Sequence, residues 1–388
     1  MSEVLFEITT DNLDTGLRGY PVGYCTTSTV NPTKGLFYVG RPLSELENKE
    51  PIEVIYLLWH GREGSPAEVT QFNQELISRS NCSPQLIQAI QTLPREAHPT
   101  KLFSIALLLA SAFQDKNSYR EDALNLIAQV PTIVATLINH HAGWGPTPPS
   151  KPELGYMENF ATQLNIPNKQ ADLTRILKIF NVLHYDHGGG NLSCFVGKSV
   201  ASSLEDIFGS LSAAMCALAG PRHGKANQES LEFVKGLVKS LGENFTEEEL
   251  EQDLNRKLAN NELIYGFGHA VLRVEDPRAT CFFKIAEASY PNDILVRAAL
   301  LLRKVGTKVL KNDIKIADPY PNVDAISGVL LSAAGFPYPE YYTVLFGLAR
   351  VVGIARQIVY EREEARNGKG TPIVRPHYIF KKSEPHGP

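Results

Sequence analysis

Apolar side chains recur at helical spacing along most of the chain. In two clear examples they are three or four positions apart, which places them on one face of an α-helix. These sets are Leu173, Ile176, Leu177, Phe180 and Leu183, and Leu231, Val234, Leu237 and Leu241. Strand-like apolar runs are few and lie mainly toward the two ends, in GLFYVG, IEVIYLL and PIVRPHYIF. The pattern predicts a mostly all-α fold with minor β-structure at the termini.

The segment 341–364, YYTVLFGLARVVGIARQIVYEREE, has a broad apolar face. Phe346 and Ile354 extend this face around the helix, so the helix is expected to be largely buried. Arg350 interrupts the apolar positions. A buried guanidinium without a partner costs several kcal/mol, on the order of 3–5. Either an internal carboxylate or a bound anion must therefore lie beside Arg350.

Two other segments differ from the amphipathic pattern. Residues 200–219 are rich in Ala, Ser and Gly, which lets another backbone approach closely. We expect a helix there that packs inside a subunit or across a subunit interface. Residues 143–155, GWGPTPPSKPELG, carry the Pro and Gly signals of a connection between helices.

The composition is that of an ordinary globular protein. The chain has 388 residues, of which 43% are hydrophobic and 21% charged. At about 150 residues per domain, this length predicts two or three domains. The 38 Lys and Arg residues against 42 Asp and Glu give a net charge of −4, which argues against nucleic acid and anionic membranes as partners. Any anionic ligand needs a local cluster of cations.

The cysteines and the N-terminal residues indicate a reducing compartment. The five cysteines show no CxxC spacing, which argues against a disulfide framework or a structural zinc site. The first twenty residues lack a basic region followed by an apolar stretch, so no secretory signal is predicted. We expect no membrane-spanning segment, because the most tempting run carries Glu205 and Asp206. The expected location is the cytoplasm.

Four short segments combine ionisable residues with Gly and Pro. They are HYDHGGGN (184–191), GPRHGKAN (220–227), YGFGHAVLRVEDPRA (265–279) and DPYPNVDAISG (318–328). Each is predicted to be a loop that presents side chains, although turn chemistry alone would also explain a single His-Gly pair. A metal site is one alternative for the histidines of these loops. The arginines among them would repel a cation, so no metal is expected.

Several motifs occur together in a fixed order. They are LAGPRHGKANQE, YGFGHAVLRVEDPRA, PNVDAISGVLL, YYTVLFGLARVVG and RPHYIF, preceded by the weaker GLRGY, STVNPTKGLFYVGRPLSEL, PTIVA and DHGGGN. In this order the motifs resemble the citrate synthase family, in a short bacterial-type chain with some mitochondrial-like motifs. The resemblance implies the citrate synthase fold and an acyltransferase that converts the acyl group into alkyl on transfer.

The implied reaction condenses acetyl-CoA with oxaloacetate and hydrolyses citryl-CoA to citrate and CoA, the first step of the tricarboxylic acid cycle. Acetyl-CoA is a substrate, and no cofactor is implied. The methyl proton of a thioester is weakly acidic, so a carboxylate base and a donor to the thioester oxygen are needed. The resemblance makes Asp324 the base, His223 that donor, and His269 the group that protonates the ketone. Arg222 and Lys225, if close, would keep His223 neutral.

Oxaloacetate carries two carboxylates, and planar guanidinium groups suit carboxylates better than lysine does. In the resembled family the tail arginine reaches the site of the neighbouring subunit, which implies a homodimer with Arg375 donated across the interface. The oxaloacetate residues implied by the resemblance are His187, His269, Arg278, Arg350 and Arg375.

The CoA site is matched less completely. Asn139 stands where the family would have an arginine, and Ala317 stands where it would have a lysine, with Lys315 as a candidate replacement. The backbone around Ile264 to Gly268 is expected to lie against the adenine. The CoA residues implied by the resemblance are Arg273, Arg18, Ile264, Gly266 and Gly268.

The resemblance also implies two domains. We expect a large helical domain from residues 1–222 and 331–388, with a smaller helical domain, 223–330, inserted between them. Three other functions stay open at this point. They are a 2-methylcitrate synthase that uses propionyl-CoA, an inactive helical scaffold and, more distantly, a metal-dependent hydrolase. One extra methylene changes selectivity by only about 1–3 kcal/mol, so the motifs do not separate the two acyl-CoA substrates.

Overall fold

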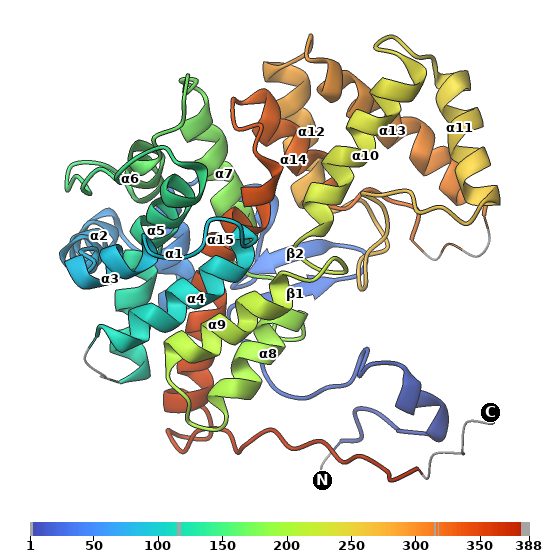
Figure 1. Ribbon diagram of the computed structural model, residues 1–388. Coiled ribbons are helices and arrows are strands. Elements are labelled where there is room, and N and C mark those ends of the chain that lie inside the picture. The colour runs from blue at the N-terminus through green and yellow to red at the C-terminus, as the bar shows by residue number, and fades with distance from the viewer. Residues whose placement is uncertain (1–2, 115–117, 314–315, 317, 382–388) are drawn as a thin grey trace, which may run out of the picture.

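A computed structural model describes residues 3–114, 118–313, 316 and 318–381. Within these residues the chain forms fifteen α-helices and one three-stranded antiparallel sheet (Figure 1). The helices before residue 220 are α1 (Pro51–His60), α2 (Pro66–Arg79), α3 (Pro84–Ile90), α4 (Pro99–Ala112), α5 (Tyr119–Ala142), α6 (Tyr156–Gln163), α7 (Leu173–His184), α8 (Leu192–Ala201) and α9 (Ile207–Leu218). The later helices are α10 (Ala226–Leu241), α11 (Glu247–Ala259), α12 (Pro277–Ser289), α13 (Ile294–Lys311), α14 (Asp324–Ala333) and α15 (Tyr342–Val359).

The sheet lies near the N-terminus and joins strands in sequence order. Its strands are β1 (Ser28–Asn31), β2 (Gly35–Tyr38) and β3 (Arg41–Pro42), and Thr29 pairs with Phe37. Short single turns are η1 (Thr10–Asp14), η2 (Leu43–Glu45), η3 (Pro339–Tyr341) and the π-type turn η4 (Tyr360–Glu364). The prediction of a mostly helical fold is confirmed.

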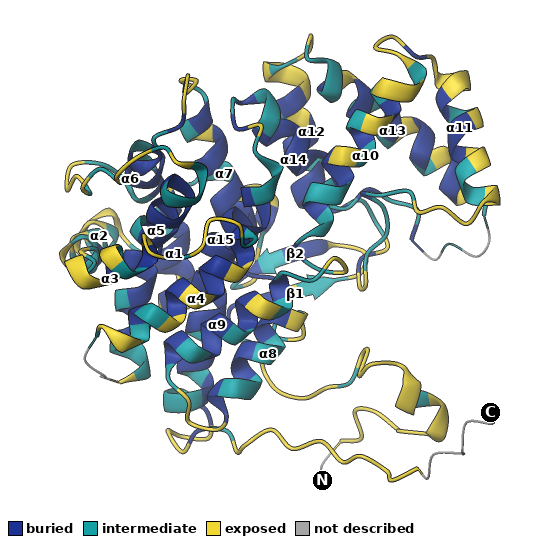
Figure 2. Cartoon of the chain, in the orientation of Figure 1, coloured by how far each residue is buried: buried dark blue, intermediate teal, exposed yellow. Residues whose placement is uncertain are grey.

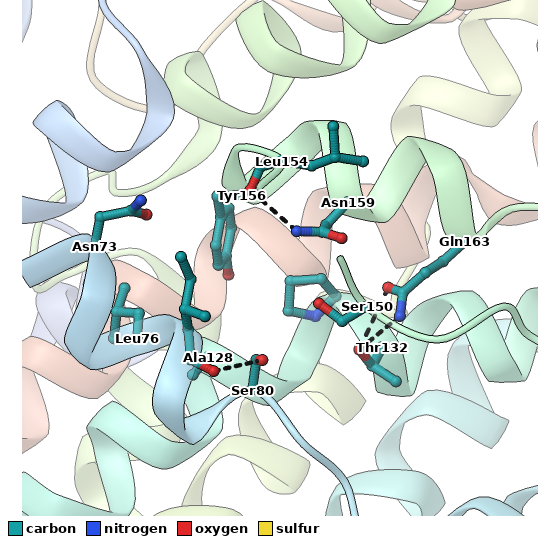
Figure 3. A pocket seen from close by; sticks show the side chains of 12 residues that line it. Asn73, Leu76, Ser80, Ala128, Thr132, Ser150, Leu154, Tyr156, Asn159 and Gln163 are labelled. Atoms are coloured by element: carbon teal, nitrogen blue, oxygen red, sulfur yellow. Dashed lines mark hydrogen bonds between the residues drawn. The ribbon is translucent and has the colours of Figure 1, made fainter. Parts of the chain in front are cut away.

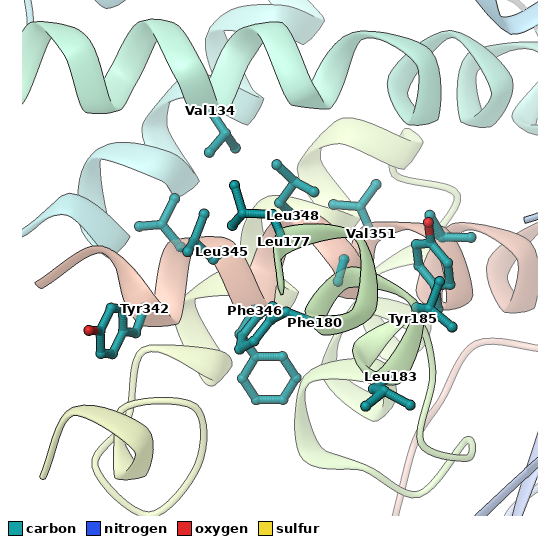
Figure 4. Close-up of a cluster of buried hydrophobic side chains, with 14 of the residues drawn as sticks. Val134, Leu177, Phe180, Leu183, Tyr185, Tyr342, Leu345, Phe346, Leu348 and Val351 are labelled. Carbon is teal, nitrogen blue, oxygen red and sulfur yellow. The ribbon is translucent and has the colours of Figure 1, made fainter. Parts of the chain in front are cut away.

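The core is centred on α15. Every residue of this helix except Arg356 is buried, as the apolar pattern predicted. Figure 4 shows Leu345, Leu348 and Val351 of α15 beside side chains of α5 and α7, and Figure 2 shows how little of this region is exposed. The whole length of α15 is therefore fixed by packing, which holds Arg350 in place.

Two of the predicted strands are not strands. The IEVIYLL run belongs to α1, whose start is fixed by Pro51 at the first position and by a capping box. In that box the Glu50 N–H donates to the Glu53 carboxylate at 2.8 Å. Most residues of α1 are buried, so the continuous apolar run reflects a helix that is buried on several faces. The tail run PIVRPHYIF forms no strand in the described residues, because Pro372 and Pro376 cannot donate to a ladder.

The small-residue segment 200–219 covers the last two residues of α8 and the whole of α9. Asp206 caps α9, since its carboxylate accepts the Gly209 N–H at 2.8 Å. A Cβ on Gly197 of α8 would lie 3.2 Å from both the Ala214 Cβ and the Ile354 Cγ2. The close backbone approach predicted for this segment therefore occurs inside the subunit, between α8, α9 and α15.

The helices form two groups. Helices α10 to α14 pack mainly on one another, and α15 packs with α5, α7, α8 and α9 (Figure 1). The predicted bounds of the two domains stay a prediction. Two segments, Tyr119–Ala142 and Pro339–Glu364, are long and apolar enough to cross a membrane, but their most apolar windows are 83% and 100% buried in the protein. That burial is typical of core helices.

Candidate active site

Two loops of the second helical group are bonded to each other. The Gly268 N–H donates to the Tyr320 carbonyl at 3.0 Å, and the Asn322 side-chain amide donates to the Gly268 carbonyl at 2.9 Å. His269 directly follows Gly268, and Asp324 lies two residues after Asn322. The paired loops therefore fix the positions of His269 and Asp324 relative to each other.

Glycine is required in the first of these loops. Gly266 is buried with φ +85°, and a Cβ at this position would lie 2.8 Å from the Ala325 Cα. Its carbonyl accepts the Asn322 N–H at 2.9 Å. Gly268 also has a positive φ, +82°, and Ile264 is half-buried at the start of the loop. These glycines shape the loop, while their contact with CoA stays a prediction.

Asp324 is the first residue of α14. Its N–H donates to the Asn322 Oδ1 at 3.0 Å, and its residue surface is half-buried. Burial raises the pKa of the Asp324 carboxyl to about 7, although the nearby Arg278 lowers it. Near neutral pH this carboxyl is thus divided between acid and carboxylate, which is the state expected of a general base.

The hydrogen bonds of His269 select one tautomer. Its Nδ1 lies 3.0 Å from the Val271 N and 2.9 Å from the Leu272 N, both of which donate to it. Burial, followed by the charge of Arg278, lowers the pKa of His269 to about 4. The neutral ring therefore carries its proton on Nε2, and this N–H is a hydrogen-bond donor.

His223 has the opposite arrangement. Its Nε2 accepts the Ser193 N–H at 3.3 Å and lies 3.1 Å from the Ser193 Oγ, so the proton of the neutral ring is on Nδ1. Burial lowers the pKa of His223 to about 4, and the second cause is the charge of Arg350. The prediction that Arg222 and Lys225 keep His223 neutral is wrong, because Arg222 is exposed and neither charge is among the causes of the shift.

His187 and Arg278 lie beside these groups. The His187 ring centroid is 5.1 Å from that of His269, and its buried Nε2 has no hydrogen-bond partner within the described part of the chain. Burial and the charges of Arg278 and Arg350 hold the His187 pKa well below its usual value. Arg278 forms a buried two-pronged ion pair with Asp276, with Nη2 to Oδ2 at 2.6 Å and Nε to Oδ1 at 3.0 Å.

Arg350 is a buried cation with unused donors. The residue is 1% exposed, and its Nε donates to the His184 carbonyl at 3.0 Å. Neither Nη1 nor Nη2 has a hydrogen-bond partner among the described residues. The guanidinium lies 4.7 Å from the Phe346 ring centre. Burial lowers the pKa of Arg350 to about 10, so the group stays charged at neutral pH.

The other predicted arginines are exposed. Arg273 lies in the His269 loop, where its Nη1 donates to the Leu272 carbonyl at 2.6 Å and to the His269 carbonyl at 3.1 Å. Arg18 lies on the N-terminal segment, and Arg375 lies on the C-terminal tail beside a cavity of about 770 Å³. No described contact brings Arg18 or Arg375 to the loops of His269 and Asp324 within one chain.

Asn139 is a structural residue. It is fully buried, its amide donates to the Gln163 carbonyl at 2.8 Å, and its Oδ1 accepts the Asn165 N–H at 3.0 Å. Its position is therefore part of the core, where no phosphate could reach it in this chain. Ala317 and Lys315 lie outside the described residues.

Other places in the molecule offer less chemistry. Among the described residues, no three His, Cys, Asp or Glu side chains are grouped so that they could hold a metal ion. The cavity between α2, α5 and α6 in Figure 3 has a volume of about 30 Å³ and no charged or imidazole lining. The candidate active site therefore consists of His187, His223, His269, Arg278, Asp324 and Arg350.

Some site residues were not identified in the sequence. Ser193 holds His223, Asp276 holds Arg278, and Asp186 accepts the His187 N–H at 2.8 Å. Asp186 directly precedes His187, and Asp276 lies two residues before Arg278. A carboxylate beside a predicted site histidine or arginine was the available signal, whereas nothing in the sequence pointed to Ser193.

Comparison with known proteins identifies the family. The family model described as "Citrate synthase, C-terminal domain" matches residues 16–377. The chain belongs to the citrate synthase family. It is an acyltransferase of enzyme class EC 2.3.3.

Relatives and solved structures agree with this assignment. This citrate synthase family member is 35% identical to the mitochondrial citrate synthase of Citrus maxima, over 97% of this chain and 83% of the relative. It is 32% identical to the peroxisomal citrate synthase of Saccharomyces cerevisiae, over 89% and 80%. A citrate synthase structure from Thermotoga maritima matches with a TM-score of 0.80 and 26% identity, over 96% of this chain and 97% of that chain.

A fourth similar protein was solved with ligands. The citrate synthase of Thermoplasma acidophilum, in a ternary complex with carboxymethyl coenzyme A and oxaloacetate, matches with a TM-score of 0.83 and 25% identity. The alignment covers 96% of this chain and 98% of that chain. The predicted family and fold are thus confirmed for this family member.

Proposed function

We propose that this enzyme condenses acetyl-CoA with oxaloacetate and hydrolyses the resulting citryl-CoA to citrate and CoA. The observation that carries the proposal is the buried Arg350, whose two terminal nitrogens have no hydrogen-bond partner in the residues that the structure describes. Four N–H groups of a buried cation without acceptors are costly, so the site requires an anion. A carboxylate fits the planar guanidinium. The ternary complex of the Thermoplasma acidophilum relative supports the same pair of substrates.

The second carboxylate of oxaloacetate is assigned to Arg278 and its neighbours. Arg278 lies close enough to influence the pKa of His187, His269 and Asp324. The unpartnered Nε2 of His187 supplies a further contact to the dicarboxylate. Asp276 fixes the Arg278 side chain in place before the ligand arrives.

The three catalytic roles follow from the protonation states. Asp324 removes a methyl proton from acetyl-CoA, while the Nδ1–H of neutral His223 stabilises the enolate oxygen. The nucleophilic carbon then attacks the oxaloacetate ketone, and the Nε2–H of His269 donates its proton to the new alkoxide. The proton gained by Asp324 returns to His269 through water before the next cycle. Water finally cleaves the thioester of citryl-CoA and releases CoA. Neutral histidines support this scheme because burial lowers the pKa of both His223 and His269 to about 4.

Asp324 sets the expected pH dependence. A base must be deprotonated, so kcat/KM is expected to rise about tenfold per pH unit below 7 and to level off above it. The pKa of Asp324 is raised to about 7, and the pKa values near 4 of His223 and His269 keep both rings neutral above about pH 5. Steady-state rates between pH 5.5 and 8.5 test this expectation. A profile that falls from pH 6 to pH 8 would contradict it.

A homodimer would bring the exposed tail arginine into use. The N-terminal segment and the tail expose large apolar side chains that a second subunit would cover, and Figure 2 shows these segments in yellow. We assign Arg375 to the oxaloacetate site of the partner, and Arg273 and Arg18 to CoA phosphates. The apolar side chains in question are Val4, Leu5, Ile8, Tyr24, Tyr378, Ile379 and Phe380. The proposed location is the cytoplasm.

Hybrid dimers test the donation of Arg375. An Asp324→Asn subunit and an Arg375→Leu subunit are each expected to be nearly inactive alone. If each tail serves the partner, one site of a hybrid dimer contains both native residues. Co-expression with random pairing should then restore about a quarter of wild-type activity, since half of the dimers are hybrids with one good site. No recovery in purified hybrids would show that the tail does not act in the partner.

The choice of acyl-CoA is tested by direct competition. We assign acetyl-CoA as the preferred substrate, with propionyl-CoA and 2-methylcitrate as the alternative. Ratios of kcat/KM for the two thioesters, measured at saturating oxaloacetate, separate them. A ratio that favours propionyl-CoA would make the enzyme a 2-methylcitrate synthase, while leaving the roles of Asp324 and Arg350 in place.

A further inference from the structure

Asp186 is a buried carboxylate that the proposed reaction does not use. It is fully buried, and its Oδ1 accepts the main-chain N–H of His187 at 2.8 Å and the Gln357 side-chain amide at 2.9 Å. Its Oδ2 accepts the Thr27 hydroxyl and, at 3.1 Å, the same Gln357 amide. These donors are uncharged, so the Asp186 charge is solvated by hydrogen bonds without an ion pair among the described residues.

Packing on α15 fixes the position of Asp186 relative to the helix that carries Arg350. A Cβ on Gly353 would lie 2.4 Å from the Tyr185 carbonyl and 2.6 Å from the Asp186 Cγ, so only glycine lets the chain pass this close to the helix. Gln357, which binds Asp186, lies two turns after Arg350 on the same helix. The Arg350 Nε in turn bonds to the main chain just before Tyr185, at the His184 carbonyl.

The charge of Asp186 acts on Arg350. Burial and the charge of Arg278 lower the pKa of the Arg350 guanidinium. Among the charged groups that raise this pKa, Asp186 has the largest effect. The other buried pair nearby, Lys198 and Glu361, is joined at 2.9 Å and is neutral as a unit. Asp186 is therefore the main internal counter-charge of Arg350, although it accepts no hydrogen bond from Nη1 or Nη2 of that residue.

We propose that Asp186 is a positioning residue that acts as a stand-in anion: its carboxylate stabilises Arg350 in the empty site and fixes the main chain at His187, while leaving the terminal nitrogens of Arg350 open for oxaloacetate. This inference rests on the proposed function. It has a distinctive consequence, because the same negative charge that stabilises the empty site repels a dianionic substrate. Removal of the charge alone should weaken the empty protein and tighten oxaloacetate binding. A residue that served only to hold the loop would weaken both.

The variant Asp186→Asn removes the charge and keeps an oxygen that can accept from His187 and Gln357. We expect the unfolding midpoint of the ligand-free variant to fall by a few degrees. We expect the dissociation constant for oxaloacetate, measured by isothermal titration calorimetry, to fall about 3- to 10-fold. The midpoint shift produced by saturating oxaloacetate should be larger in the variant than in the wild type.

Thr27→Val is the matched control. It removes one hydrogen bond to Asp186 and leaves the charge. We expect it to lower the unfolding midpoint equally with and without oxaloacetate, and to leave the dissociation constant within about twofold. Weaker oxaloacetate binding by Asp186→Asn, or an unchanged ligand shift, would overturn the stand-in role.

A double-variant cycle covers the case in which Asp186→Asn does not fold. In an Arg350→Leu background the cation is absent, so Asp186→Asn should cost less stability than in the wild type. A folded double variant beside an unfolded single variant supports the proposal, and failure of both to fold overturns it. If oxaloacetate fails to shift even the wild-type midpoint, the proposed function itself is wrong. A normal wild-type shift with no difference in Asp186→Asn overturns only the role of Asp186.

Discussion

Replacement of Asp324 by Asn should lower kcat about 10³-fold and leave the KM for oxaloacetate within about threefold, because general-base catalysis contributes about 10²- to 10⁴-fold. The amide has nearly the shape of the carboxyl but cannot accept the methyl proton. Oxaloacetate is assigned to the arginines and to His187, so its affinity does not depend on this side chain. Steady-state kinetics and the exchange of acetyl-CoA methyl protons in deuterated water measure both effects.

The stability of this variant provides a separate readout. The Asp324 pKa is raised in the folded protein, so ionising this carboxyl opposes folding, and its contribution to wild-type stability decreases as pH rises toward about 7. A neutral amide avoids this cost, so Asp324→Asn should be at least as stable as the wild type at pH 8. Asp293→Asn is the control, since Asn also caps α13 well. Wild-type proton exchange in Asp324→Asn would show that another group is the base.

Replacement of Arg350 by Leu should raise the KM for oxaloacetate about 10²-fold or more. Each charge-assisted hydrogen bond contributes about 1.5–3 kcal/mol, and two such bonds from Nη1 and Nη2 to a carboxylate would be lost. In the structure two effects on stability oppose each other. Leu suits the apolar surroundings and removes two nitrogens that have no hydrogen-bond partner among the described residues, whereas the buried Asp186 loses its main counter-charge.

The unfolding midpoint of ligand-free Arg350→Leu should therefore stay within a few degrees of the wild type, while the stabilisation by oxaloacetate disappears. Arg356→Leu, on the same helix, is the matched control. Arg356 bonds to Glu364 at 2.9 Å and not to the site, so its loss should reduce stability and leave oxaloacetate affinity unchanged. If Arg350→Leu kept the oxaloacetate response, the anion site would lie elsewhere.

The helical body could be predicted from the sequence because its periodicity reports burial directly. The apolar face of α15 and the requirement of Arg350 for an anion were both available from residue order alone. The IEVIYLL run was misread as a strand because a helix buried on several sides has no clear 3.6-residue period. The capping residues Glu50, Pro51 and Glu53 were the better signal for α1.

The parts of the site that sequence reasoning missed depend on contacts between distant segments. Asp186 is held by Thr27 and Gln357, which lie more than 150 residues away on either side. The assignment of a charge effect on His223 to its sequence neighbours failed for the same reason, since the charge that acts on it comes from Arg350 on α15. Sequence proximity is a poor guide to proximity around a buried group.

The proposed reaction joins acetyl-CoA and oxaloacetate at this site. Product analysis of purified enzyme, given both substrates, tests it most directly. We expect citrate and free CoA in equal amounts from the wild type, with about 10³-fold slower formation by Asp324→Asn. Oxaloacetate consumed without citrate, or citrate formed at the same rate by Asp324→Asn, would contradict the account.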